Sequence, residues 1–215
     1  MKYKAAIFDL DGTLLDTIKD LHNSTNYALT INNMPKRSLD EVRCFVGNGV
    51  RLLIERAVPD GAKNPLFDKV FNDFKNHYSI HCKDTTKPYD GIIDVLKILK
   101  NNNIKTAIVS NKLDSAVKAL NEEYFGSLIP VAIGETDNIR KKPAPDTVIE
   151  ALKLLGCSEN DSVYIGDSEV DVETASNCNM DCIAVTWGFR DIKTLVKAGA
   201  TTFANDTKEL LDEIM

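Results

Sequence analysis

The chain has 215 residues, of which 43% are hydrophobic, so it can bury a sizeable core and has the composition of an ordinary globular protein. Its formal net charge is −6 and its Lys and Arg residues are scattered, which argues against nucleic acid and anionic membranes as partners. The N-terminus becomes polar too early for a signal peptide, and no apolar run approaches the length of a membrane span. The five cysteines are odd in number and mostly scattered, as in proteins of a reducing compartment, so we expect a cytoplasmic protein.

Five short apolar segments rich in β-branched residues recur along the chain. They span residues 5–8, 105–110, 129–133, 162–166 and 182–186. Each predicts a buried parallel strand, because the segment is apolar on both faces instead of alternating. Apolar residues at helical spacing fill the intervals between the later segments, over residues 92–99, 113–120 and 148–155. Strand alternating with helix predicts an open α/β sheet.

The connection between the first two predicted strands is much longer than the others. About a hundred residues separate these strands, whereas a simple crossover needs about a dozen. Three stretches of this connection show apolar residues at helical spacing, which predicts one helix in each. They are residues 17–31, 40–58 and 66–81. We therefore expect a helical bundle, residues 17–87, inserted into an α/β core made of residues 1–16 and 88–215. The turn-forming stretch 87–91 and the residues near Asp16 would form a two-strand hinge.

Polar side chains follow the carboxyl ends of three predicted strands, which is where ligands bind in an open α/β sheet. The side chains at these ends are Asp9, Asp11, Ser110, Asn111, Asp167, Ser168 and Asp171. Lys142 stands just before the helix that leads into the fourth strand. We expect the carboxylates, the hydroxyls and the lysine to meet at one mouth of the sheet.

Carboxylates that share one cleft repel each other unless a cation joins them, and oxygen ligands favour a hard ion, here Mg²⁺ with several waters retained. An ionised Asp9 beside the metal would be a competent nucleophile toward phosphorus, as in enzymes that form an aspartyl-phosphate. Asp11 lies on the same side of an extended chain and could protonate a leaving oxygen, then deprotonate water. The Thr13 and Ser110 hydroxyls could hold phosphate oxygens, and Lys142 adds a positive charge.

Each of these signals also has a purely structural interpretation. An Asp-Gly turn after a strand is common, Ser110 and Asn111 can cap a following helix, and Lys142 can be an ordinary surface lysine. The string "GDSEVD" at 166–171 can likewise be a turn followed by an N-cap. Their order along the chain favours a phosphoryl-transfer site, in which the protein positions groups and neutralises charge.

Four strings resemble, in order and spacing, the four motifs of the haloacid dehalogenase-like hydrolase superfamily. They are "DLDGT" (9–13), "VSN" (109–111), "KPAPD" (142–146) and "GDSEVD" (166–171). The helical insert after the first string resembles the α-helical cap of that superfamily. Three further strings are similar to the phosphoglycolate phosphatase group, namely "DLDGTLLDT" (9–17), "VGNG" (46–49) and "TWGFR" (186–190). The resemblance covers nearly the whole chain.

This resemblance implies a Rossmann-like core with a central parallel sheet, and a cap that opens for substrate and closes to exclude water. It implies that Asp9 is the phosphorylated nucleophile and Asp11 the general acid and base. It implies that Mg²⁺ binds the Asp9 side chain, the Asp11 backbone carbonyl and Asp167, with Asp171 supporting Lys142 or the metal waters. The dehalogenases of the superfamily lack the second Asp and its transporting ATPases carry Thr there, so Asp11 favours phosphatase or phosphomutase chemistry.

The resemblance also implies which residues hold the phosphate group. They are Thr13, Ser110, Asn111 and Lys142. Lys141 is adjacent, but Lys142 directly precedes a proline, as the lysine of the family motif does.

We expect a Mg²⁺-dependent phosphatase that acts on 2-phosphoglycolate or a similar small phosphomonoester, as a monomer or a homodimer. Arg51, beside "VGNG", could bind a substrate carboxylate bidentately, although an Arg on a helix surface is the plain alternative. A sugar-phosphate mutase or an inorganic pyrophosphatase of the same fold could use the same core residues. A non-catalytic phosphate-binding protein would be expected to lack Asp9 or Asp11. His77 and His81 lie four residues apart without an evident third metal ligand.

Overall fold

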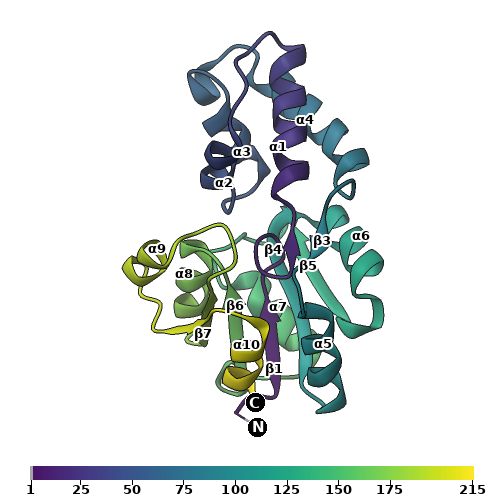
Figure 1. Cartoon of the computed structure of the whole chain (residues 1–215), viewed down its shortest axis with the longest axis vertical. Helices are drawn as coiled ribbons and strands as arrows, with labels where there is room; N and C mark the ends of the chain where they lie inside the picture. The colour runs from purple at the N-terminus through teal and green to yellow at the C-terminus, as the bar shows by residue number, and fades with distance from the viewer. Residues whose placement is uncertain (1) are drawn as a thin grey trace.

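The computed structural model describes residues 2–215, and its centre is a six-stranded sheet whose paired strands are all parallel (Figure 1). The strands are β1 (Ala5–Phe8), β4 (Lys105–Leu113), β5 (Val131–Glu135), β6 (Ser162–Gly166), β7 (Asp181–Val185) and β8 (Thr202–Ala204). The first five confirm the predicted strands, with some ends shifted by a few residues. The sequence pattern does not predict β8, a three-residue strand at the edge of the sheet.

Helices cover both faces of the sheet, because its strands are apolar on both faces. In β1, Ala6 and Phe8 belong to one hydrophobic cluster, and Ala5 and Ile7 belong to another on the opposite face. The first cluster includes residues of α5 (Ile92–Asn101), α6 (Asp114–Tyr124) and α10 (Thr207–Ile214), and the second includes residues of α7 (Asp146–Leu155) and α8 (Glu169–Asn177). The short helix α9 (Ile192–Lys197) packs beside α8. This arrangement confirms the predicted α/β fold class.

The strand order β5-β4-β1-β6-β7-β8 produces a topological switch point beside β1. From β1 the sheet extends through β4 to β5, and the chain then returns through α7 to begin β6 on the other side of β1. Connections that leave in opposite directions open a crevice at the carboxyl end of the central strand. Asp9 directly follows β1, so the topology puts this carboxylate at the crevice.

Between β1 and β4 the chain forms a bundle of four helices with a hydrophobic cluster of its own. The helices are α1 (Ile18–Ile31), α2 (Leu39–Phe45), α3 (Val50–Ala57) and α4 (Phe67–His81). The bundle lies over the carboxyl end of the sheet (Figure 1). The antiparallel pair β2 (Leu15–Asp16) and β3 (Lys87–Pro88) carries the chain into and out of it, where the sequence predicts a two-strand hinge. The limits of the two units, 1–16 with 88–215 and 17–87, stay predictions.

The prediction of a single helix over residues 40–58 is wrong, because the structure has two helices there, α2 and α3, with a break at 46–49. Val46 is extended, with a φ of −70° and a ψ of 158°. Gly47 has a φ of +119°, a conformation that glycine adopts without steric cost. The break brings the 46–49 loop to the sheet, where Gly47 O accepts a hydrogen bond from Asn111 Nδ2 at 3.2 Å.

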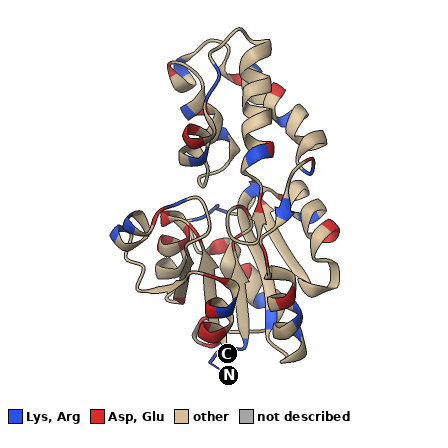
Figure 2. Ribbon diagram, in the orientation of Figure 1, with Lys and Arg blue, Asp and Glu red and all other residues tan. Residues whose placement is uncertain are grey.

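Residues of both charges are interspersed along the ribbon of the two units (Figure 2). This distribution agrees with the scattered charges of the sequence. Within residues 2–215, no helix combines the length and the hydropathy that crossing a membrane requires. The two ends of the chain meet at the side of the sheet away from the bundle, where Lys2 N donates to Met215 O at 2.9 Å (Figure 1).

Candidate active site

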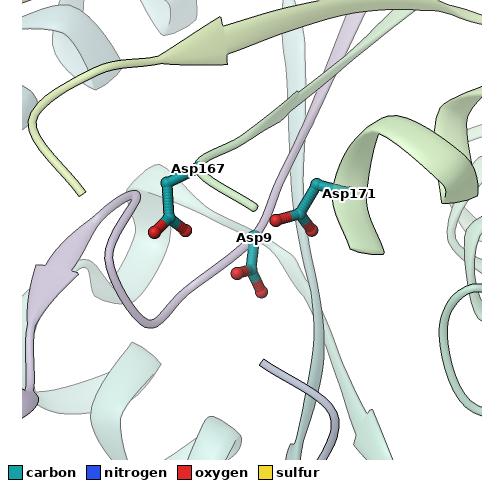
Figure 3. Close-up of side chains that lie close together, drawn as sticks. All are labelled: Asp9, Asp167 and Asp171. Atoms are coloured by element: carbon teal, nitrogen blue, oxygen red, sulfur yellow. The ribbon is translucent and has the colours of Figure 1, made fainter. Parts of the chain in front are cut away.

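Three buried carboxylates meet at the carboxyl end of the sheet, and they come from three segments (Figure 3). Asp9 directly follows β1, Asp167 directly follows β6, and Asp171 lies in the first turn of α8. One oxygen of each lies within 4.8 Å of an oxygen of the other two. The structure therefore brings together three of the four aspartates that the sequence predicts as metal-binding residues.

Lys142 supplies the positive charge that contacts this cluster. Its Nζ donates to Asp9 Oδ1 at 2.7 Å, to Asp171 Oδ1 at 2.8 Å and to the Tyr164 hydroxyl at 3.0 Å. Asp171 Oδ2 accepts from the backbone N and the Oγ of Ser168, at 3.1 and 2.6 Å, in the capping box that begins α8. Both oxygens of Asp171 are therefore engaged, and its position fixes the ammonium group of Lys142 beside Asp9.

Burial and mutual repulsion disfavour the ionised forms of these carboxylates. Burial raises the pKa of Asp9 from 3.8 to about 7, and the charge of Asp171 adds to this effect while Lys142 opposes it. Burial also raises the pKa of Asp167 well above its usual range, with further contributions from Asp171 and Asp9. Burial alone would lower the pKa of Lys142, but Asp171 and Asp9 outweigh it and raise that pKa well above 10.5.

Asp167 is oriented by groups from two other loops. Its Oδ1 accepts from Thr13 Oγ1 at 3.2 Å, and its Oδ2 accepts from Phe189 N at 2.7 Å. Gly12 has a φ of +90°, and a Cβ atom at that position would collide with the Asp167 carboxylate. Glycine is therefore required at 12 both for the backbone conformation and for the close approach of the two loops.

The donor set fits a hard divalent cation. Three carboxylates face one ammonium group, so their ionised forms would leave excess negative charge in a place where burial makes charge costly. Carboxylate oxygens are the ligands that Mg²⁺ prefers. A divalent ion among Asp9, Asp167 and the neighbouring backbone would offset the repulsion that raises both pKa values.

A cavity of about 30 Å³ lies between this cluster and the helical bundle. Its lining from the sheet side consists of Asp9, Asp11, Ser110, Asn111 and Lys112. Its lining from the bundle consists of Leu21, Val46, Gly47, Gly49, Val50 and Leu53. The two predicted catalytic carboxylates therefore face one small space, closed on one side by apolar side chains.

The residues predicted to hold phosphate lie at this cavity or directly behind it. Ser110 lines it, and its Oγ accepts from Lys112 N at 3.2 Å. Asn111 Nδ2 donates to Lys142 O at 2.9 Å and to Gly47 O, so it ties the loop of Lys142 to the bundle. Thr13 is fully buried against Asp167. Their roles toward phosphate stay predictions.

Arg51 lies apart from this group, on α3. Its guanidinium stacks 4.8 Å from the ring centroid of Phe67, and Nη2 is 3.4 Å from Asp68 Oδ1. Arg51 lines an open groove shared with residues 140–144, while the cavity at Asp9 has a different lining. The contact with a substrate carboxylate that the sequence suggests stays a prediction.

Lys112 and Arg190 belong to the site, although sequence reasoning does not select them. Lys112 Nζ donates to Asp11 Oδ1 at 2.8 Å and to the hydroxyl of Tyr78 at 2.6 Å. Arg190 donates to Val46 O at 2.6 Å and to Arg43 O at 2.9 Å, so it holds the end of α2 against the sheet. The signals available in the sequence are weak: Lys112 directly follows "VSN", and Arg190 ends the "TWGFR" string.

Known proteins with similar sequences and structures agree with this geometry. The model of the haloacid dehalogenase-like hydrolase family matches residues 6–185. A phosphoglycolate phosphatase of Rhodobacter capsulatus is 34% identical over 191 residues, which cover 86% of this chain and 85% of that protein. Phosphoglycolate phosphatase 1 of Pseudomonas aeruginosa is 29% identical over 214 residues, which cover 97% of this chain and 78% of that protein. A crystal structure from Lactobacillus delbrueckii subsp. bulgaricus, provisionally assigned as a phosphoglycolate phosphatase, is 39% identical with a TM-score of 0.95, and the match covers 100% of this chain and 99% of that one.

Proposed function

The chain belongs to the haloacid dehalogenase-like hydrolase family and is a phosphoric monoester hydrolase, and we propose that it is a Mg²⁺-dependent phosphatase acting through an aspartyl-phosphate on Asp9. The substrate that we propose is 2-phosphoglycolate or a similar small phosphomonoester. One observation carries the proposal: the buried Asp9 carboxylate opens onto a cavity that Asp11 also lines, with Lys142 2.7 Å away. The names of the relatives support the choice of substrate.

The proposed reaction uses Asp9 and Asp11 in two steps. In the first step, a carboxylate oxygen of Asp9 bonds to phosphorus, the bond from phosphorus to the ester oxygen breaks, and Asp11 donates a proton to the departing oxygen. In the second step, water attacks phosphorus while Asp11 takes its proton, so that inorganic phosphate leaves and Asp9 is restored. Lys142 offsets part of the negative charge that gathers at Asp9 during both steps.

Asp9 and Asp167 would hold Mg²⁺ with their side chains, and Asp11 with its backbone carbonyl. When bound, Mg²⁺ supplies positive charge that stabilises the phosphoryl oxygens and the ionised form of the buried carboxylates. The raised pKa values of Asp9 and Asp167 support this assignment, because the cluster needs a further cation to ionise fully at neutral pH.

The helical bundle acts as a cap in this proposal. Leu21, Val50 and Leu53 cover the cavity from the bundle side, so they exclude water from Asp9 while the ester bond breaks. The close cover of these side chains over Asp9 favours compact substrates. Entry of substrate requires the bundle to move away from the sheet, and the paired strands β2 and β3 are where the chain can bend.

The decisive experiment measures phosphate release by the wild-type protein, by Asp9→Asn and by Asp212→Asn. Asp212 is an exposed residue of α10, so its variant controls for the change of charge. We expect 2-phosphoglycolate to be hydrolysed in Mg²⁺ and not in excess chelator, and Asp9→Asn to lower turnover by at least about a thousandfold, because an amide is a poor nucleophile. Beryllium fluoride, a phosphoryl mimic, should bind at Asp9 only when Mg²⁺ is present.

Turnover that persists in Asp9→Asn, or in the chelator, would contradict the mechanism. Parallel assays with pyrophosphate and with a hexose phosphate test the choice of substrate. Faster release from pyrophosphate would favour a pyrophosphatase. Isomerisation of the hexose phosphate without net release would favour a mutase.

A further inference from the structure

A buried lysine links Asp11 to the helical bundle. The side chain of Lys112 is 2% exposed, and its Nζ lies 2.8 and 3.0 Å from the two carboxylate oxygens of Asp11. The same atom donates to the hydroxyl of Tyr78 at 2.6 Å and lies 4.7 Å from the centre of its ring. A lysine ammonium group has three protons, and these three oxygens account for them. The ammonium group is therefore held in one place.

The three residues come from segments that belong to different parts of the fold. Asp11 is in the turn after β1, Lys112 is near the end of β4, and Tyr78 is in the last part of α4 in the bundle. Asp11 and Lys112 both belong to the sheet side, whereas Tyr78 belongs to the bundle and would move with it when the site opens as proposed. The contact between Lys112 and Tyr78 therefore exists only while the bundle lies over the sheet.

The contacts argue that Lys112 acts on Asp11 and not on substrate. Lys112 lines the cavity, but its protons are already directed at Asp11 and Tyr78. Tyr78 is buried outside the lining of the cavity and stacks on Phe74 at 5.4 Å. Removing the Tyr78 hydroxyl would leave the buried ammonium group with a proton lacking an acceptor, which favours a different position for that group.

We propose that Lys112 is a positioning residue that holds the Asp11 carboxyl in place for proton transfer. Tyr78 holds the ammonium group of Lys112 in the required position when the bundle covers the site. The inference rests on the proposed function. Asp11 enters the first step protonated on one oxygen, which gives up its contact with Lys112. As the bond from phosphorus to the ester oxygen breaks, this oxygen passes its proton to the departing oxygen, and the other Asp11 oxygen stays bound to Lys112. Proton transfer is thereby coupled to closure, so the leaving group is protonated where water is excluded.

The experiment compares Tyr78→Phe and Lys112→Met with the wild-type protein on two substrates. An alkyl monoester without a second anionic group, 2-hydroxyethyl phosphate, needs a proton on its leaving oxygen, whereas p-nitrophenyl phosphate has a leaving group that departs without one. The quantity to compare is kcat/KM, which reports the steps up to transfer of the phosphoryl group to Asp9 and leaves out its later hydrolysis. Tyr3→Phe is the matched control, because Tyr3 is a buried tyrosine whose hydroxyl donates to Asp181 at 2.7 Å, at the opposite end of β1.

We expect Tyr78→Phe to lower kcat/KM for the alkyl ester about tenfold and for the aryl ester less than about twofold, since general acid catalysis contributes about a hundredfold or more. Lys112→Met should lower kcat/KM for the alkyl ester about a hundredfold more than it lowers kcat/KM for the aryl ester. Tyr3→Phe should leave the ratio of the two kcat/KM values unchanged. If Lys112→Met does not fold, as judged by circular dichroism, the result for Tyr78→Phe decides.

Equal losses on both esters would overturn the inference, because a merely structural role would affect both alike. A third assay uses 2-phosphoglycolate, which carries a carboxylate. A loss confined to this substrate would also overturn the inference, and would assign Lys112 to substrate binding. In either case the proposed function stands if Asp9→Asn abolishes release from both esters. If the wild-type protein shows no release that depends on Asp9, the proposed function and this inference fall together.

Discussion

Replacing Asp9 by Asn should stabilise the metal-free protein while it removes turnover. Without a cation, the folded protein keeps a proton on Asp9 up to a pH of about 7, because burial raises the pKa of this carboxyl from its usual 3.8. The unfolded chain loses the same proton near pH 4. Between these values the folded state binds more protons than the unfolded state, so the free energy of unfolding falls as the pH rises. Asn does not ionise in this pH range, so the variant does not lose stability in this way.

The size of the effect follows from the two pKa values. The span from 3.8 to about 7, at about 1.4 kcal/mol for each pH unit, corresponds to about 4 kcal/mol at pH 8. At pH 5 only the pH interval from 3.8 to 5 contributes to the difference in the free energy of unfolding, which is then about 2 kcal/mol. Asp9→Asn should therefore be the more stable protein by about these amounts, with no difference near pH 4.

Urea unfolding in excess chelator at pH 4, 5 and 8 measures these differences. Mg²⁺ should stabilise the wild-type protein at pH 8, since the ion binds ionised carboxylates. The difference in the free energy of unfolding between the wild-type protein and the variant should therefore become smaller. A variant less stable than the wild-type protein at pH 8, or a difference that grows as the pH falls, would refute the reasoning. Either result would mean that ionised Asp9 stabilises the fold without a metal.

Three further substitutions test other contacts of the site. Gly12→Ala should weaken Mg²⁺ binding by about tenfold or more in calorimetry, because its methyl group would displace the Asp167 carboxylate; unchanged binding would contradict the role of that carboxylate. Arg190→Met should raise KM several-fold and speed amide exchange over residues 43–49, because it removes the donors to Arg43 O and Val46 O; protection equal to that of the wild-type protein would show that other contacts hold the bundle. Arg51→Ala should change kcat/KM for 2-phosphoglycolate less than about twofold, because the side chain is exposed and held by Asp68; a tenfold loss absent with p-nitrophenyl phosphate would instead assign it to the substrate carboxylate.

The sheet and the carboxylate cluster could be predicted because their signals are local. A strand buried on both faces is a short apolar run whatever it pairs with, and Asp9 and Asp167 directly follow such runs. Parallel strands end at the same edge of a sheet, so the residues after them meet without knowledge of the packing. The strand β8 gives a weaker signal, because it has three residues and only Ala204 among them is buried.

Other features could not be predicted because their causes lie far apart in the chain. Val42, Phe45, Val46 and Val50 keep helical spacing across the break between α2 and α3, so periodicity alone indicates one helix. The contacts of Lys112 depend on residues 101 and 34 positions away, Asp11 and Tyr78. A lysine in a strand and a tyrosine on the apolar face of a helix are each ordinary until the bundle is seated on the sheet.

The pairing of Leu15 with Pro88 and of Asp16 with Lys87 brings the start and the end of the bundle to the same spot. Because the two ends of the inserted bundle are adjacent, the bundle does not push apart the strands of the core. The length and sequence of the bundle can therefore vary while β1 and β4 keep their register. The apolar side chains over the cavity belong to that segment, and the carboxylates beneath it belong to the host. Apart from Tyr78, through which the bundle acts on Asp11 in our proposal, selection can therefore change which substrates the enzyme admits without changing how it reacts.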